Sequence, residues 1–166
     1  MPVQDQGINL ERYMLVPRTL IFLTRKDEIL LLKGAENKRL WAGLYNGVGG
    51  HIEQGEDVLS SAQRELHEET GLLSSNLRLC GVITVDTQTN PGVGVFIFTG
   101  VCSEGEPMHS KEGTLEWVKI SGIKYLPLVA DLQVLLPKIL DMKPDDPPFS
   151  AFSRYDDDGK LVLTIQ

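Results

Sequence analysis

The residues best able to do chemistry lie between positions 50 and 72, where the sequence reads GHIEQGEDVLSSAQRELHEETGL. Glu65, Glu68 and Glu69 are spaced three and four residues apart, so on an α-helix they lie on one side within a turn of each other. Like charges at this spacing cost a helix about 0.2–0.5 kcal/mol per pair. Arg64 should point away from Glu69, so we expect that one guanidinium cannot neutralise all three carboxylates.

A hard divalent cation can compensate this charge, because Mg²⁺ prefers oxygen ligands and is commonly held by carboxylates together with substrate phosphates. Gly49 and Gly50 precede the segment, and glycine lets a backbone carbonyl approach the same place closely. The alternative is an ordinary acidic face in water. An apolar stripe that adjoins the carboxylates argues against it and places them at the rim of a packed cleft.

The segment that carries the carboxylates should be a helix that starts after Gly55 and ends at Gly71. Acidic Glu56 and Asp57 suit its first turn, and Gly71 suits its C-terminal cap. Its apolar positions follow a 3.6-residue repeat and are Val58, Leu59, Ala62 and Leu66. Residues 44–52, which contain three glycines, should form a kinked strand or tight turn before it.

The rest of the chain alternates strand-like and helix-like segments. We expect strands at 14–24, 28–33, 77–86, 93–102 and 115–120, a second helix at 129–141 and a closing hairpin at 151–166. The segments at 14–24 and 28–33 should form a hairpin. This order predicts an α/β (α+β) fold, a mixed β-sheet with helices on its faces, in a single domain over residues 1–166.

Composition excludes several classes of protein. The chain has 166 residues and a formal net charge of −7, which disfavours binding to polymeric nucleic acid but leaves small phosphorylated molecules open. Its apolar runs are too short for a membrane span, and its polar N-terminus does not resemble a secretory signal, so a cytoplasmic location is expected. Cys80 and Cys102 are isolated and should be buried thiols rather than zinc ligands or a disulfide.

The carboxylate segment resembles the Nudix box, GX5EX7REUXEEXGU, without a departure: Gly50, five residues, Glu56, seven residues, then RELHEETGL at 64–72. The resemblance implies an α/β/α sandwich that binds Mg²⁺ or Mn²⁺ and hydrolyses a nucleoside diphosphate linked to another group. It implies that Glu65 and Glu69 are the main metal ligands, with Glu68 and a carbonyl of Gly49 or Gly50 assisting. Glu56 and Arg64 would pair to hold the loop.

The hydrolysis needs a base to take a proton from the attacking water. In relatives an extra carboxylate often comes from a later loop, and Glu112 stands at the matching place ahead of Trp117. Glu112 could equally be a loop glutamate in water. Glu104 and Glu106 are the reserve candidates.

Residues outside the box should select the substrate. The approach to the box reads Asn46-Gly47-Val48-Gly49-Gly50, which is similar to MutT-like family members that hydrolyse oxidised purine nucleoside triphosphates, and there the asparagine binds the base. Alternatively, Asn46 merely turns the chain. Three further candidates for substrate contact are Asp131 at the start of the second helix, Lys33 for a phosphate and Thr19 for the base pocket.

The resulting expectation is a metal-dependent pyrophosphohydrolase that acts on a nucleoside triphosphate, plausibly 8-oxo-dGTP. Hydrolysis of ADP-ribose or dinucleoside polyphosphates is a second reading, and a domain that only senses a nucleotide is a third. The expected partner is a small nucleotide. The sequence leaves the oligomeric state open.

Overall fold

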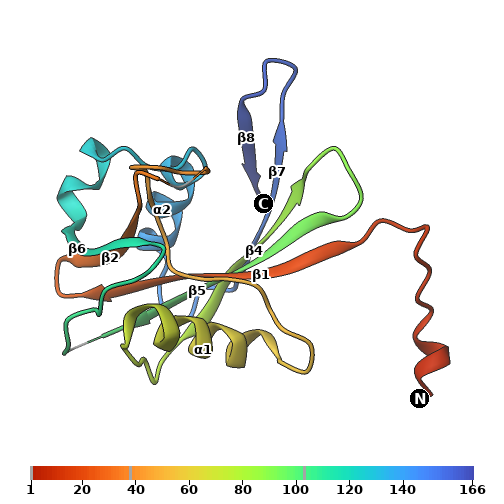
Figure 1. Cartoon of the computed structure of the whole chain (residues 1–166), viewed down its shortest axis with the longest axis horizontal. Helices are drawn as coiled ribbons and strands as arrows, with labels where there is room; N and C mark the ends of the chain where they lie inside the picture. Colours follow the sequence, from red (N-terminus) through yellow and green to blue (C-terminus); the bar gives the residue numbers. More distant parts are fainter. Residues whose placement is uncertain (1, 38, 103) are drawn as a thin grey trace.

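The computed structural model describes residues 2–37, 39–102 and 104–166, over which the chain forms a mixed eight-stranded sheet with helices on both faces (Figure 1). The strands are β1 (Leu15–Arg25), β2 (Glu28–Gly34), β3 (Tyr45–Asn46), β4 (Arg78–Asp86), β5 (Gly92–Val101), β6 (Gly113–Lys119), β7 (Phe149–Tyr155) and β8 (Leu161–Ile165). The helices are α1 (Val58–Thr70) and α2 (Leu132–Asp141), with 3₁₀ turns η1 (Val3–Gln6) and η2 (Ile120–Tyr125). The order of the sheet is β3-β2-β1-β5-β4-β7-β8, and β6 pairs with β2.

The divergence of β1 and β2 makes room for the glycine-rich segment. The two strands form the expected antiparallel hairpin, but they pair only at its tip, from Arg25↔Glu28 to Thr24↔Ile29. Further along, β1 instead bonds to the glycine segment: the Ile21 amide donates to the Val48 carbonyl at 2.7 Å. The loop that leads to α1 is therefore held as an extra partner of β1.

Two apolar clusters lie on opposite faces of the sheet. Because successive side chains of a strand point to opposite faces, Ile21 of β1 packs with the α1 residues Ala62 and Leu66, whereas Phe22 packs with Leu132 and other residues of α2. Figure 1 shows α1 below the sheet and α2 above it. The expected sandwich, with its mixed sheet, is confirmed.

Helix α1 ends at Gly71 as expected, but it begins at Val58, so Glu56 and Asp57 precede its first turn instead of lying in it. Asp57 is its N-cap and accepts hydrogen bonds from the amides of Leu59 and Ser60, and Gly71 ends it in the left-handed conformation at φ 70°. The expected stripe is wrong at Leu59, which is 39% exposed. The buried face runs through positions 58, 62 and 66, four residues apart, and it takes in Ser61 and Thr70 instead.

Helix α2 begins three residues later than expected. Residues 127–129 extend the pairing of β3: the Tyr45 amide donates to the Pro127 carbonyl at 2.9 Å, and the Val129 amide donates to the Tyr45 carbonyl at 3.1 Å. These bonds hold the segment extended, so the helix starts at Leu132 with Asp131 at its N-cap. Neither 3₁₀ turn was expected.

Two expectations about composition can be compared with the structure. Cys80 and Cys102 are both buried and free, and burial raises the pKa of the Cys80 thiol to about 11. Within the ranges that the structure covers, no helix has both the length and the apolar character needed to cross a bilayer.

Candidate active site

Arg64 is the centre of the polar network on α1. Its Nε and Nη2 donate to the two carboxylate oxygens of Glu56 at 2.6 and 3.0 Å. Its Nη1 donates to Glu65 Oε1 at 2.9 Å and to Glu68 Oε2 at 3.1 Å. The guanidinium thus joins the loop before α1 to two of the three clustered carboxylates.

The network offsets part of the repulsion among the clustered carboxylates, because the guanidinium pairs with Glu65 and Glu68 together. The same guanidinium, aided by the Glu53 amide, lowers the pKa of Glu56 to about 2. Glu56 therefore stays ionised and pairs with Arg64, as the resemblance implies.

Gly50 brings the backbone against Glu65. A Cβ at position 50 would lie 2.5 Å from a carboxylate oxygen of Glu65, so no other residue type fits without a shift. The Gly50 carbonyl accepts from the Thr19 amide at 2.9 Å, which fixes the turn to β1. At Gly49 a Cβ would lie 2.1 Å from the Thr19 carbonyl oxygen. Gly49 is required because a Cβ would meet backbone, whereas a Cβ at Gly50 would displace the carboxylate of Glu65.

Glu65, Glu68, Glu69 and the backbone of Gly49 and Gly50 form a group of oxygen donors, called here the carboxylate cradle. These donors fit a hard cation. The Glu65 side chain is 14% exposed and uses Oε1 for Arg64, which leaves Oε2 for another ligand. One carboxylate oxygen of Glu69 is buried, and Glu68 is 60% exposed at the rim. Oxygen donors of this type suit Mg²⁺. In the described part of the chain, no three His, Cys, Asp or Glu side chains form a preassembled metal cluster.

The three candidate bases occupy different environments. Glu112 lies immediately before β6, is exposed, and is positioned by its backbone, whose carbonyl accepts from the Ala35 amide at 3.2 Å. Glu106 is paired with Arg25 at 2.7 Å, and Glu104 is exposed. Of the reserve pair, Glu106 therefore already has a structural partner.

Asn46 folds back on its own backbone. Its Oδ1 accepts from the Gly47 amide at 2.8 Å, which is the turn-forming role that the sequence left open. The side-chain NH₂ group is the part of Asn46 that remains for a ligand. Asn46 is half-buried next to Tyr45, whose backbone pairs with residues 127–129 and so brings Asp131 towards the same edge of β3.

The other predicted substrate residues differ in accessibility. Burial raises the pKa of the Asp131 carboxyl, so this group favours its protonated form more than an aspartate in water. Lys33 is half-buried, with Nζ 5.8 Å from the centre of the Tyr45 ring, and the Tyr45 hydroxyl donates to Glu116 Oε2 at 2.8 Å. Thr19 is 4% exposed and faces the Gly50 amide, so it supports the loop.

Two residues beside the loop were not singled out from the sequence. Arg18 of β1 and His51, which follows Gly50, lie opposite each other in an antiparallel bridge, and the guanidinium contacts the imidazole. An isolated arginine on a strand and a histidine after a glycine pair carry no recognisable spacing. Only the pairing of the loop with β1 brings them together.

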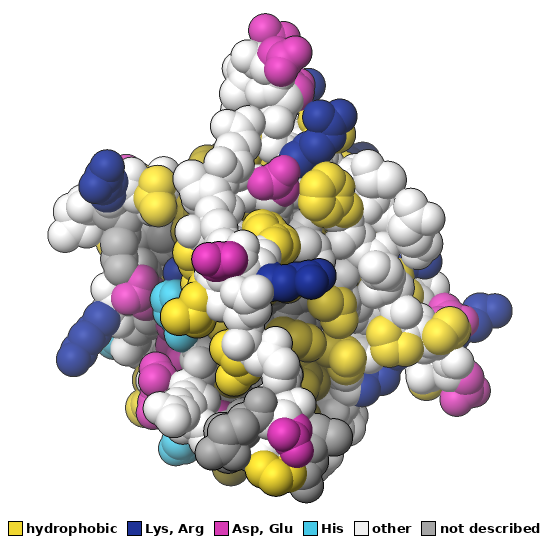
Figure 2. Space-filling view, turned by 90° about the vertical axis from the view of Figure 1, so that its right-hand side faces the viewer, with side chains coloured by type: hydrophobic (Ala, Val, Ile, Leu, Met, Phe, Trp, Pro, Cys, Tyr) yellow, Lys and Arg dark blue, Asp and Glu magenta, His cyan; other side chains and the backbone are white. Residues whose placement is uncertain are grey.

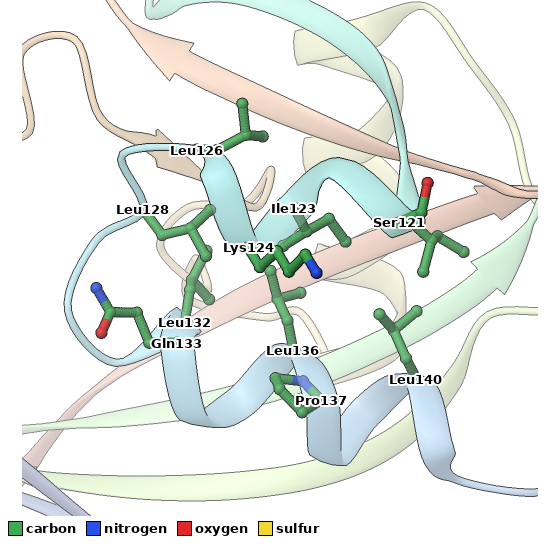
Figure 3. Close-up of a pocket in the computed structure, with 11 residues that line it drawn as sticks. Ser121, Ile123, Lys124, Leu126, Leu128, Leu132, Gln133, Leu136, Pro137 and Leu140 are labelled. Carbon is green, nitrogen blue, oxygen red and sulfur yellow. The ribbon is translucent and has the colours of Figure 1, made fainter.

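A separate apolar pocket of about 660 Å³ lies between η2 and α2 (Figure 3). Leu132, Leu136 and Leu140 line it from one side of α2, and Lys124 extends over it from η2. None of the residues predicted from the sequence for catalysis, metal binding or substrate binding lines this pocket. The carboxylate cradle is therefore the candidate active site.

Comparisons with known proteins agree with this arrangement. The sequence model of the NUDIX domain matches residues 14–139. The oxidized purine nucleoside triphosphate hydrolase of Mus musculus is 31% identical over 126 residues, 75% of this chain and 80% of that protein. The protein of the same description from Danio rerio is 32% identical over the same shares.

Among solved structures, a MutT protein from Bacillus halodurans superimposes with a TM-score of 0.77 and 27% identity, over 91% of this chain and 97% of that one. The shared fold, the matched domain and the intact acidic motif lead to one identification. The chain belongs to the Nudix domain family and is a hydrolase that acts on phosphoanhydride bonds.

Proposed function

We propose that the chain is a Mg²⁺-dependent pyrophosphohydrolase that cleaves an oxidised purine nucleoside triphosphate, such as 8-oxo-dGTP, to the nucleoside monophosphate and diphosphate. The observation that carries the proposal is the Gly50–Glu65 contact within the intact Glu56–Arg64 network. The similarity to oxidized purine nucleoside triphosphate hydrolases supports the choice of substrate. All box carboxylates are retained, which favours an enzyme over a nucleotide sensor.

The metal-binding residues would be Glu65 and Glu69, with Glu68 and the Gly50 or Gly49 carbonyl assisting. Mg²⁺ or Mn²⁺ bound there supplies neutralisation of phosphate oxygens and a lowered pKa for a coordinated water. The Glu56–Arg64 pair keeps the loop against α1, and Arg64 limits the motion of Glu65 and Glu68 through its two further bonds.

Proton transfer and base recognition fall to residues outside α1. Glu112, exposed on the loop before β6, accepts the proton of the attacking water in this proposal. Asp131 contacts the purine edge through its carboxyl group, whose pKa is raised by burial. The NH₂ group of Asn46 donates to the base. Lys33 contacts a phosphate of the substrate, and Thr19 supports the wall of the base pocket.

A steady-state panel with Mg²⁺ tests the proposal. The substrates are 8-oxo-dGTP, dGTP, dCTP, ADP-ribose and a diadenosine polyphosphate, with products resolved by ion-exchange chromatography. We expect the highest kcat/KM for 8-oxo-dGTP, with monophosphate and diphosphate as products. Preferential turnover of ADP-ribose or the dinucleotide would replace the proposed substrate. Absence of turnover on every member would contradict catalysis of this kind.

A further inference from the structure

Arg18 and His51 form a defined cation–imidazole contact at the edge of the active-site loop. Arg18 Nε lies 3.1 Å and Nη2 lies 3.0 Å from His51 Nε2. A guanidinium has only donors, so Nε2 accepts and the proton of the neutral ring is on Nδ1. The contact leaves Nη1 and one hydrogen of Nη2 for another acceptor.

Arg18 differs from the neighbouring arginines in its charge environment. Arg25 pairs with Glu28 and Glu106, and Arg64 pairs with Glu56, Glu65 and Glu68. Across the residues described by the structure, Arg18 has no ion pair, although it is half-buried. A partly desolvated cation next to a neutral ring is favourably placed for an anionic ligand.

His51 is fixed at both its ring and its backbone. The His51 carbonyl accepts from Arg64 Nη2 at 3.1 Å and from the Ser61 hydroxyl at 3.4 Å. The guanidinium that orders the carboxylates therefore also anchors the residue that orients Arg18. Arg18 is therefore linked to Arg64 through His51, whose ring contacts Arg18 and whose carbonyl accepts from Arg64.

The residues next to Arg18 across the sheet are apolar. Along one face of the sheet, the register places Arg18 next to Val95 of β5, and Val95 next to Ile83 of β4. Figure 2, which views the molecule from the side of the β1 start, shows acidic side chains at the tip of the β7–β8 hairpin, with both basic and apolar side chains below them. With a net charge of −7, the chain needs local cations to hold a polyanion.

We propose that Arg18, oriented by His51, binds a phosphate group of the nucleotide substrate. The proposal rests on the proposed function and adds a substrate contact to it. The planar guanidinium matches the geometry of phosphate oxygens and stays charged at all relevant pH values. The Arg18 side chain lies on the same face of the sheet as Phe22, and its contact with His51, the residue after Gly50, holds the guanidinium at the edge of the glycine loop. His51 is a positioning residue in this scheme.

Binding without metal tests the contact independently of turnover. The affinities of dGTP, dGMP and deoxyguanosine are measured in EDTA by competition against a fluorescent dGTP analogue, for the wild type and for Arg18→Gln. Loss of a charge-assisted contact should weaken dGTP binding about tenfold or more and leave deoxyguanosine binding unchanged. Arg154→Gln, which changes an exposed arginine on β7, is the matched control and should bind like the wild type.

Each other outcome has a definite meaning. An equal loss for deoxyguanosine would mean that Arg18 contacts the base, and no loss for dGTP would mean that it contacts nothing; either overturns the proposal. ADP-ribose is included as a further ligand, with its binding and that of dGTP also measured directly by titration calorimetry in EDTA. If ADP-ribose binds, dGTP does not, and Arg18→Gln weakens ADP-ribose, the phosphate contact stands while the triphosphate function fails.

Variants of His51 test the positioning role. His51→Gln keeps an acceptor for the guanidinium, whereas His51→Leu removes it. We expect the Gln variant to bind dGTP more tightly than the Leu variant, with the same affinity for deoxyguanosine. Equal dGTP affinities for the two variants would contradict the role of His51 in orienting Arg18.

Discussion

Arg64 and Glu56, eight residues apart in the sequence, are joined by two parallel hydrogen bonds of 2.6 and 3.0 Å. A bidentate pair of this kind fixes direction as well as distance. It connects the end of the glycine loop to the middle of α1, the helix that carries the carboxylates. The site therefore depends on a residue that need not touch metal or substrate.

The first prediction concerns this pair and pH. The folded-state pKa of Glu56 is about 2, below its ordinary value of 4.5, so its contribution to stability is complete above about pH 4.5 and is lost as the pH falls towards 2. Glu56→Gln should lower the melting temperature at neutral pH, and the gap to the wild type should narrow through that window. Thermal unfolding followed by circular dichroism checks this; a gap independent of pH would contradict it.

The second prediction concerns the Gly50 contact. Gly50→Ala places a methyl group 2.5 Å from the Glu65 carboxylate, so Glu65 must move and Mn²⁺ affinity should fall about tenfold or more. Gly122→Ala is the control, because a Cβ there meets nothing within 4 Å. Titration calorimetry with Mn²⁺ measures the effect. Equal affinities for the two variants would show that the contact does not shape the metal site.

The third prediction separates catalysis from folding. Glu69→Gln should reduce kcat by about a hundredfold or more while the melting temperature stays close to that of the wild type, since the change keeps the shape of the side chain and removes its charge. Glu53→Gln, an exposed change outside the helix, should keep full activity. A Glu69→Gln variant with most of its kcat would remove this residue from the metal ligands.

The fourth prediction concerns Asp131. Burial raises its folded-state pKa above the ordinary value of 3.8, so the folded state is penalised as the pH rises past that value and is not penalised below it. Asp131→Asn should therefore unfold at a higher temperature than the wild type at neutral pH and at a similar temperature near about pH 3. The exposed Asp157→Asn is the control. A lower melting temperature for Asp131→Asn at neutral pH would contradict the assignment.

The sequence predicted most elements because their signals are local. Runs of apolar residues separated by a short polar turn identify β1 and β2, and Gly71 marks the end of α1. The start of α2 was wrong because residues 127–129 pair with Tyr45, a partner more than 80 positions away. The predicted burial of Leu59 was wrong because the buried stripe of α1 depends on how the helix is rotated against β1.

The candidate site also has features that the sequence predicts and features that it does not. The identities of the acidic residues follow from spacing, but their partners depend on side-chain conformation: Arg64 bonds Glu65 and Glu68 with the same nitrogen. The Arg18–His51 contact depends on the glycine segment lying beside β1, and a single sequence contains no signal for that pairing.

Diffraction from crystals soaked in Mn²⁺, with anomalous data, tests the central claim most directly. The account predicts an anomalous peak coordinated by carboxylate oxygens of Glu65 and Glu69, beside the Gly50 carbonyl. A strong peak elsewhere on the molecule, with Glu65 and Glu69 uncoordinated, would contradict it.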